Sequence, residues 1–220
     1  MPVLIKICGL NTLHSLQASL KAGADMIGLV FHPKSPRFVP VTLAADLADE
    51  ARGRAKIVAL ICDADDKTIQ QIDDMVEPDF YQLHGKETPS RAAEIKAKFK
   101  RPIIKAIGVS APSDLSAIAQ YVPVCEYILL DAKPPAGAAY PGGHGLTFNV
   151  SILEKLDIKQ KFILSGGLTP ETVASAIKAV RGMNRSIIGV DVSSGVEGAK
   201  QGQKSLEKID AFIKAARKAG

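Results

Sequence analysis

The sequence predicts an α/β protein in which eight parallel strands close into a single (β/α)8 TIM barrel. Short β-branched runs alternate with amphipathic, Ala/Leu/Lys-rich stretches along the whole 220-residue chain. Eight such units fit this length, and eight units close a barrel. The main alternative is a doubly wound open sheet, which usually carries a G-x-G-x-x-G turn after its first strand. The first turn here, Cys8-Gly9-Leu10-Asn11, lacks that fingerprint.

The expected elements follow one another without a linker. Strands are expected at Val3–Cys8, Met26–Val30, Lys56–Ile61, Phe80–Leu83, Pro102–Ile107, Glu126–Leu130, Phe162–Leu164 and Ile187–Val190. Helices are expected at Leu13–Ala22, Leu43–Arg52, Thr68–Val76, Ser90–Lys100, Ser113–Tyr121, Val150–Leu156, Glu171–Val180 and Leu206–Lys218. Asn11, Ser113 and Thr169 are placed to cap the helices that follow them. We therefore expect one catalytic barrel domain over residues 1–220.

The composition argues against several classes of function. The net charge is +5, but the charges are interleaved and only 5% of residues are aromatic, so we expect no nucleic-acid partner. A mildly basic surface suits a small anionic substrate. No apolar run is long enough to span a membrane, and the first residues lack the basic lead of a secretory signal. The three cysteines are odd in number and have no C-x-x-C spacing, which favours the cytoplasm over a disulfide framework and argues against a zinc site.

Two residues at predicted strand ends could act as acid and base. Barrel active sites are built at the carboxyl ends of the strands, where Cys8 closes the first strand and Asp131 ends the sixth. A thiol and a carboxyl on separate strands suit proton removal at one substrate atom and proton delivery at another. Taken alone, Cys8 could be a small buried hydrophobe and Asp131 a helix cap or loop ion pair. Cys62 and Cys125 lack comparable partners and are expected to serve packing.

Glycine and serine turns after the last two strands predict a phosphate site. Loops at these places in a barrel bind phosphate through backbone N–H groups, and glycine lets the backbone approach the anion closely. Two turns on adjacent strands favour this interpretation over ordinary tight turns. Gly142 and Gly143 of the Pro/Gly-rich loop at Lys133–Gly145 are weaker candidates for the same role. The turns contain Gly166 and Gly167, and Ser193, Ser194 and Gly195.

Three further polar positions have a possible place in the site. Arg37, stiffened by Pro33 and Pro36, could hold a substrate carboxylate through a planar two-point contact. His84 could equally bind substrate or hold its loop. Side chains alternate along a strand, so Lys6 shares the inward face of Cys8, and barrel closure brings Asp191 near. We therefore expect a structural Lys6–Asp191 ion pair below the catalytic residues.

The ordered set of motifs resembles the phosphoribosylanthranilate isomerase family. The matching segments are Lys6-Ile7-Cys8-Gly9-Leu10, Gly23-Ala24-Asp25, Ser35-Pro36-Arg37, Gln82-Leu83-His84-Gly85, Leu130-Asp131, Gly142-Gly143, Ser165-Gly166-Gly167-Leu168 and Val190-Asp191-Val192-Ser193-Ser194-Gly195-Val196-Glu197. The chain departs from the family pattern after the sixth strand, at His144, Leu146, Asn149 and Val150, and before the last helix, where Ser205 replaces an aspartate.

The resemblance implies an isomerase of the third step of tryptophan synthesis from chorismate. The implied reaction is the Amadori rearrangement of N-(5-phosphoribosyl)anthranilate to 1-(2-carboxyphenylamino)-1-deoxyribulose 5-phosphate. By the same resemblance Asp131 is the general acid, Cys8 the general base, and Arg37 the ligand of the anthranilate carboxylate. Gly166, Gly167 and the turn at 193–195 would hold the phosphate. Every step is a proton transfer, so no cofactor or metal is expected.

Two rivals remain at this point. Another phosphosugar barrel enzyme would place different residues at the strand ends. A histidine-pathway isomerase would carry acids after strands one and five, and an indole-forming synthase would carry lysines, for which Lys105 is the one weak candidate. The other rival is a catalytically silent phosphate-binding barrel, against which the presence of both Cys8 and Asp131 argues.

Overall fold

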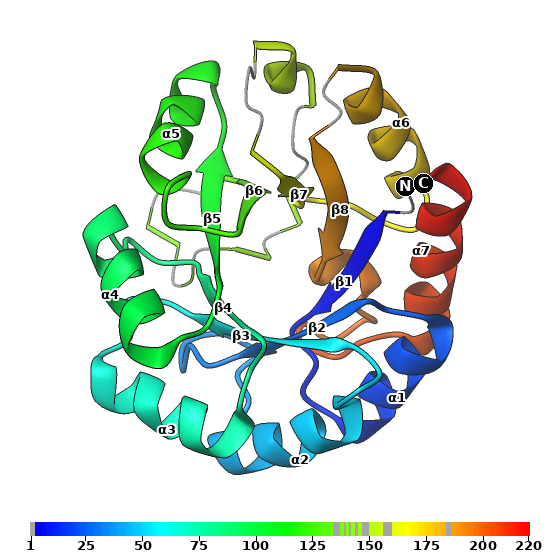
Figure 1. The fold of residues 1–220 in the computed structure, drawn as a ribbon. Coiled ribbons are helices and arrows are strands. Elements are labelled where there is room, and N and C mark those ends of the chain that lie inside the picture. Colours follow the sequence, from blue (N-terminus) through cyan, green and yellow to red (C-terminus); the bar gives the residue numbers. More distant parts are fainter. Residues whose placement is uncertain are drawn as a thin grey trace.

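A computed structural model describes residues 3–133, 137–138, 140, 142–143, 145–146, 150–155, 160–183 and 186–220 of the chain. Its centre is a closed barrel of eight parallel strands in sequence order, with β1 paired to β8. Helices surround the strands on the outside, and the two labelled chain ends lie close together beside α7 (Figure 1). The predicted (β/α)8 fold is confirmed. Of the family departures, His144 and Asn149 lie outside the described residues.

The strands agree closely with the predicted ones. Those at β5, β6 and β8 extend two residues further than expected because pairing with their neighbours continues through Gly108 and Val109, Asp131 and Ala132, and Asp191 and Val192. Glycine and alanine carry little strand preference of their own, so these ends were not visible as β-branched runs. The strands are β1 (Leu4–Cys8), β2 (Met26–Val30), β3 (Lys56–Ile61), β4 (Phe80–Leu83), β5 (Ile103–Val109), β6 (Tyr127–Ala132), β7 (Phe162–Leu164) and β8 (Ile187–Val192).

Most helices also lie close to their predicted places. The one expected at Val150–Leu156 is a 3-10 helix over Val150–Lys155, and Leu156 lies outside the described residues. The expected helix at Ser113–Tyr121 is instead a 3-10 helix followed by one short α-helical turn, because Asp114 accepts from the N–H groups of Ser110 and Ala111 and tightens the chain there. The α-helices are α1 (Leu13–Ala22), α2 (Val41–Ala51), α3 (Asp66–Val76), α4 (Pro89–Phe99), α5 (Ile118–Tyr121), α6 (Val173–Met183) and α7 (Leu206–Ala219), and the 3-10 helices are η1 (Pro112–Ala117), η2 (Val150–Lys155) and η3 (Ser194–Val196).

All three predicted caps are wrong by one or a few residues; the third, Thr169, lies four residues before α6, which begins only at Val173. Thr12, not Asn11, caps α1 by accepting from the Ser15 N–H, and Ser113 lies inside η1 rather than before it. The Thr169 hydroxyl accepts from Glu171 N–H in the turn that precedes α6. Ser205 caps α7 through the Lys208 N–H, so the serine that departs from the family pattern serves as the cap.

Side-chain alternation divides the core into two layers. One face of the strands packs outward against the helices in a large apolar cluster that includes Ile5, Tyr81 and Phe212. The other face fills the barrel with a smaller cluster of Met26, Val58, Ile104, Ala106, Leu129 and Ile163. This plug closes the lower barrel, so polar inward-facing residues above it form the floor of a site at the carboxyl ends of the strands.

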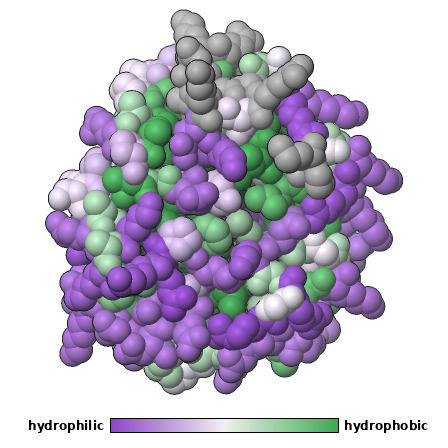
Figure 2. All heavy atoms as spheres, in the orientation of Figure 1, coloured by the Kyte–Doolittle hydropathy of each residue, from purple (hydrophilic) through white to green (hydrophobic). Residues whose placement is uncertain are grey.

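The outer surface is mostly hydrophilic on the face seen in Figure 2, with hydrophobic residues in small groups between the polar ones. Among the described residues, no helix is both long and apolar enough to cross a membrane.

Candidate active site

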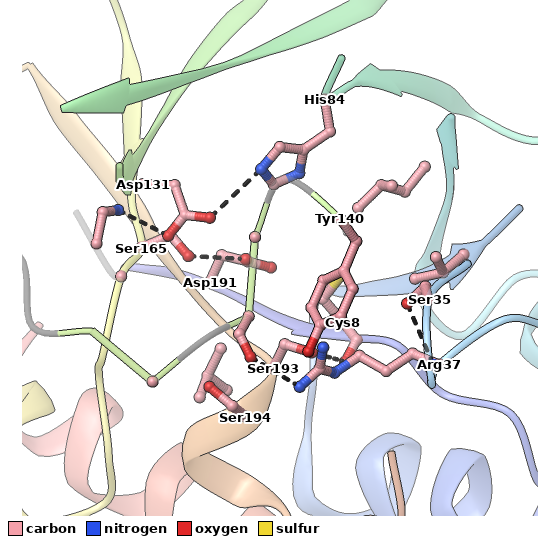
Figure 3. A pocket seen from close by; sticks show the side chains of 18 of the residues that line it. Cys8, Ser35, Arg37, His84, Asp131, Tyr140, Ser165, Asp191, Ser193 and Ser194 are labelled. Carbon is pink, nitrogen blue, oxygen red and sulfur yellow. Dashed lines mark hydrogen bonds and ion pairs between the residues drawn. The ribbon is translucent and has the colours of Figure 1, made fainter. Parts of the chain in front are cut away.

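A pocket opens at the carboxyl ends of the strands, where barrel sites are expected (Figure 3). It collects residues from β1 to β4 and from β6 to β8, together with part of the loop after β6. All the residues that the sequence nominates line it: Cys8, Arg37, His84, Asp131, Gly142, Gly143, Gly166, Gly167, Ser193, Ser194 and Gly195.

Cys8 ends β1 and lies beside a buried cation. Lys6, two residues earlier on the same inward face, forms an ion pair with Asp191 at 2.7 Å, which confirms that predicted pair. The Lys6 ammonium also lies close enough to Cys8 for its charge to act on the thiol, so it does more than stabilise the barrel. Gly28 on β2 makes room for this contact, since a Cβ there would lie 2.8 Å from Cys8 Sγ and 3.1 Å from Lys6 Nζ.

Burial and charge act on the Cys8 thiol in opposite directions. Burial raises its pKa above the ordinary value, and the Lys6 cation lowers the pKa without cancelling the effect of burial. Burial alone would lower the pKa of Lys6, but Asp191 and then Cys8 raise it, so Lys6 stays charged. Ser165 donates to the other oxygen of Asp191 at 3.1 Å and completes the ion pair's surroundings. A permanent cation therefore faces the position where a Cys8 thiolate would form.

Asp131 faces His84 across the pocket mouth (Figure 3). Its Oδ1 accepts from the Ala132 N–H at 2.8 Å, and its Oδ2 lies 3.3 Å from His84 Nε2. Gly142 lies directly over this pair, because a Cβ there would be 2.8 Å from Asp131 Oδ2 and 2.9 Å from the imidazole. The carboxyl is thus fixed on one oxygen, while the other faces the pocket and an imidazole able to exchange a proton.

Arg37 is held by an internal carboxylate that the sequence argument did not assign. Its Nε and Nη2 bond the two oxygens of Glu197 at 2.6 and 3.1 Å, and Nη2 also donates to Gly143 O. Glu197 occupies the planar two-point contact that was expected for a ligand. Nη1 makes no hydrogen bond to a described residue and lies beside Gly143, where a Cβ would be 2.5 Å away. The guanidinium is therefore fixed, and only its Nη1 side is left available at the pocket.

Lys204 completes a buried charged cluster with Arg37 and Glu197. Its Nζ lies 3.2 Å from Glu197 Oε1 and donates to Ser193 O at 2.9 Å. Burial lowers the pKa of Lys204 to about 8, and the Arg37 charge adds to that effect against the attraction of Glu197. Burial alone would raise the pKa of Glu197, but Arg37 and Lys204 hold it below its usual range. The net charge of this cluster leaves the Arg37 side of the pocket positive.

The glycine turns after β7 and β8 lie against each other. Gly166 and Gly167 both have positive φ, at 82° and 66°, and Gly195 is packed so closely that a Cβ would lie 1.9 Å from Leu168 O. The N–H groups of Gly166, Gly167 and Ser194 donate to no described residue. Ser193 Oγ, by contrast, already donates to Cys8 O at 3.1 Å. Free backbone donors at two touching turns can bind an anion.

Replacing Gly195 with alanine is expected to separate these turns. The new Cβ would meet backbone atoms of Leu168 that cannot rotate away, so we expect a KM for a phosphorylated substrate raised at least about tenfold and a loss of about 1–3 kcal/mol in the free energy of unfolding. Steady-state kinetics and chemical denaturation measure the two effects. Gly198→Ala is the control, since the nearest atom there is 3.9 Å from the new Cβ. An unchanged KM in Gly195→Ala would remove the turns from anion binding.

Several residues of the pocket have no distinctive signal in the sequence. Glu197 was visible only as the last residue of the strand-eight motif. Gln82 lies two residues before His84, so side-chain alternation points both toward the pocket. A glutamine amide is neither titratable nor nucleophilic, so the residue type alone does not indicate a catalytic site. Cys62, predicted to serve packing alone, also lines the pocket, and burial raises its pKa to about 12, so it stays a thiol. Cys125 is buried in the outer core as expected.

Lys105 does not belong to the site. Its neighbours Ile104 and Ala106 fill the barrel, so Lys105 points outward, where Nζ bonds Glu87 Oε2 at 2.8 Å and Gly85 O at 2.9 Å. The one lysine that could have supported the synthase alternative therefore faces away from the pocket. Among the described residues, no group of three His, Cys, Asp or Glu side chains is placed to hold a metal ion.

These features define a (β/α)8-barrel enzyme whose pocket combines acid–base groups with sites for anions. Residues 5–215 match the family model described as N-(5'phosphoribosyl)anthranilate (PRA) isomerase. An N-(5'-phosphoribosyl)anthranilate isomerase of Rhodopseudomonas palustris (strain BisA53) is 49% identical over 99% of this chain and 97% of its own length. The chain belongs to this family of isomerases.

Solved structures of the family agree with the fold. The phosphoribosyl anthranilate isomerase of Thermotoga maritima is 35% identical, with a TM-score of 0.85 over 98% of this chain and 99% of its own. Another structure, 32% identical with a TM-score of 0.81 and the same coverage, is of such an isomerase in complex with reduced 1-(o-carboxyphenylamino)-1-deoxyribulose 5-phosphate. This chain is accordingly an isomerase of tryptophan biosynthesis that catalyses the Amadori rearrangement of N-(5'-phosphoribosyl)anthranilate.

Proposed function

We propose that Cys8 is the general base and Asp131 the general acid of this rearrangement. The observation that supports these roles is that both residues line one pocket, each beside a group that assists it: Lys6 at Cys8 and His84 at Asp131. Acid and base on separate strands can act on different atoms of one bound sugar.

In the first step Asp131 gives its proton to the furanose ring oxygen. The C1–O bond breaks, the nitrogen lone pair forms a C1=N Schiff base, and the ring oxygen becomes the C4 hydroxyl. A carboxyl group can do this only while protonated. Because the Ala132 N–H occupies Oδ1, the proton would sit on Oδ2, which faces the pocket and His84 Nε2. His84 is placed to return a proton to that oxygen for the next turnover.

In the second step Cys8 acts as a thiolate and removes the proton from C2. The C2–H electrons form a C1=C2 double bond and the C=N electrons return to nitrogen. The enolamine then tautomerises to the C2 ketone: the C2 hydroxyl loses its proton as the C2=O bond forms, and the C1=C2 electrons take up a proton at C1. Lys6 stabilises the thiolate by charge and hydrogen bonding. Nothing in these steps requires a bond to sulfur, so Cys8 is a base rather than a covalent nucleophile.

Two anion sites would hold the ends of the substrate. The free edge of Arg37 suits the anthranilate carboxylate, since Glu197 fixes the guanidinium from the opposite edge. The backbone donors of Gly166, Gly167, Ser194 and Gly195 suit the phosphate. The complex of a relative with a reduced product, which carries both anionic groups, supports a small anionic substrate here. Gly142 and Gly143 would shape the pocket by packing on the Asp131–His84 pair and on Arg37.

We further propose that residues 1–220 act as one catalytic barrel domain in the cytoplasm, without cofactor or metal and without a nucleic-acid or membrane partner. Proton transfers alone complete the reaction. Cys8, Cys62 and Cys125 are all free thiols, as a reducing compartment favours.

Replacing Lys6 with methionine tests the assistance to Cys8. Loss of the cation raises the pKa of Cys8 further, so the limb of the kcat/KM profile that rises with pH should move upward by at least about one pH unit, and activity at pH 7 should fall about tenfold. The assay follows the loss of anthranilate fluorescence with freshly made phosphoribosylanthranilate from about pH 6 to about pH 11, a range extended upward because the pKa of Cys8 lies above that of an ordinary thiol.

A double variant controls for the unpaired charge that this change leaves. Lys6→Met alone leaves Asp191 buried without a charged partner, whereas Lys6→Met with Asp191→Asn removes both charges. Lys6 affects the pKa of Cys8 more strongly than Asp191 does, so the double variant should show a smaller upward movement in the same direction. A pH profile identical to that of the wild type in both variants would exclude Lys6 from supporting the base.

A further inference from the structure

A glutamine at the floor of the pocket has one polar group without a partner. Gln82 on β4 is 0% exposed, and its Nε2 lies 3.1 Å from His84 Nδ1. Its Oε1 is buried and forms no hydrogen bond with a described residue. Rotating the amide by half a turn would exchange the two atoms and leave Nε2 unpaired instead. One end of this amide is therefore unsatisfied in either orientation.

An unpaired amide end is costly in this position. The strand register places Gln82 between Leu60 of β3 and Ile104 of β5, and apolar residues fill the barrel beneath it. A methionine or leucine would fit such surroundings without leaving a buried polar atom unpaired. Gln82 is one of the residues that line the pocket, and a small change of its side-chain torsions would bring the buried free end to a ligand bound there. The arrangement points to a hydrogen bond that forms when substrate binds.

The proposed mechanism indicates which part of the substrate lies there. With the carboxylate at Arg37 and the phosphate at the β7 and β8 turns, the middle of the sugar lies over the pocket floor. Cys8 acts at C2 and Asp131 on the oxygen that becomes the C4 hydroxyl, so C3 lies between them. Gln82 is linked to Asp131 through His84, which places the amide on that middle segment. The C3 hydroxyl takes no part in the chemistry and can both donate and accept.

We propose that the free end of the Gln82 amide hydrogen-bonds the C3 hydroxyl of the sugar and makes the enzyme selective for substrates that carry it. This inference rests on the proposed function, because the positions of C2 and C4 follow from the roles of Cys8 and Asp131. A sugar without the hydroxyl leaves the buried amide end unpaired in the complex. Sites built in this way reject the deoxy analogue strongly.

The test compares two stable ligands on two proteins. The ligands are the reduced product, 1-(o-carboxyphenylamino)-1-deoxyribulose 5-phosphate reduced at C2, and its 3-deoxy counterpart, and calorimetry gives Kd for each. The wild type should bind the hydroxylated ligand on the order of 10- to 100-fold more tightly. Gln82→Met should bind the two within about twofold of each other, because its side chain has the length of glutamine without the amide.

The ratio of the two Kd values, measured on one protein, separates the contact with the C3 hydroxyl from the contact of Gln82 with His84. Gln82→Met also removes the partner of His84 Nδ1, but that loss affects both ligands equally. Gln70→Met, on the outer face of α3, should keep the wild-type ratio, and Gln82→Leu replaces Gln82→Met if the latter does not fold. Equal binding of the two ligands by the wild type, or an unchanged ratio in the Gln82 variant, would overturn the proposal.

Failure of the proposed function would be recognised separately. It would appear as normal turnover in variants of Cys8 or Asp131, whereas the ligand ratio measures binding alone. If Gln82→Met changes the ratio of the two Kd values while Cys8→Ser turns over normally, the contact with the C3 hydroxyl stands and Cys8 is not the base.

Discussion

Replacing Cys8 with serine is expected to lower kcat by about 1,000-fold while changing the affinity for the reduced product less than about threefold. The serine hydroxyl is nearly the size of the thiol, so the contacts of Lys6 and Gly28 with this position persist. Its pKa, however, is far too high for the neighbouring cation to produce an alkoxide at neutral pH. Fluorescence kinetics and calorimetry measure the two quantities. Activity within tenfold of the wild type would exclude Cys8 as the base.

Isotope exchange identifies the step that Cys8→Ser blocks. Substrate deuterated at C2 should release deuterium to water with the wild-type enzyme and retain it with the variant, because only the base acts on that bond. Cys125→Ser is the matched control, since Cys125 is a buried thiol of the outer core and burial raises its pKa to about 11. That control should turn over and exchange like the wild type.

The barrel itself could be predicted because its signals are local and repeated. Strands such as β2 and β3 are continuous apolar runs, as expected for parallel strands buried on both faces, and α1 was placed at its observed bounds. The misjudged elements have local causes that periodicity does not reveal. Asp114 tightens η1 by accepting hydrogen bonds from the N–H groups that precede it. Asn11 and Thr12 are both residue types that cap helices, and in the structure Thr12 is the one that caps α1.

Contacts between strand residues could likewise be predicted from the sequence, whereas contacts between loop residues could not. Lys6 and Asp191 could be paired because side-chain alternation and barrel closure are both regular, and the register does place these two residues opposite each other. Arg37 and Glu197 both lie in loops and are 160 residues apart in the sequence. No repeat fixes the path of either loop, so their contact could be learned only from the structure.

The charged residues around Cys8 and Arg37 form two groups with different main effects, although Lys204 of the second group also lowers the pKa of Cys8 slightly. Lys6 and Asp191 lie under Cys8 and determine how easily the thiolate forms. Arg37, Glu197 and Lys204 lie beside the pocket and orient one cationic edge. Ser193 connects the groups, because its hydroxyl donates to Cys8 O and its own carbonyl accepts from Lys204. The base and the carboxylate site are therefore held at a fixed relative position, which a reaction between two ends of one small substrate requires.

Replacing Asp131 with asparagine should also lower kcat by about 1,000-fold, but at an earlier step than Cys8→Ser. An amide has the shape of the carboxyl group and can still accept from the Ala132 N–H, yet it has no proton to give to the ring oxygen. The sugar should therefore stay closed. Rapid-mixing absorbance should show no Schiff base in Asp131→Asn, whereas Cys8→Ser, which keeps the acid, should accumulate it. Asp49→Asn makes the same change on an exposed ion-paired side chain and should leave kcat unchanged.

The step at which each variant stops distinguishes a general acid from a residue that only supports the pocket. A purely structural Asp131 would leave the ring-opening step in place, and its variant would accumulate the same open intermediate as Cys8→Ser. Adding the Asp131 change to Cys8→Ser should abolish that accumulation, because ring opening precedes proton removal at C2. An open Schiff base that persists in the double variant would show that another group protonates the ring oxygen. His84, 3.3 Å from the Asp131 carboxyl, would then be the first residue to replace.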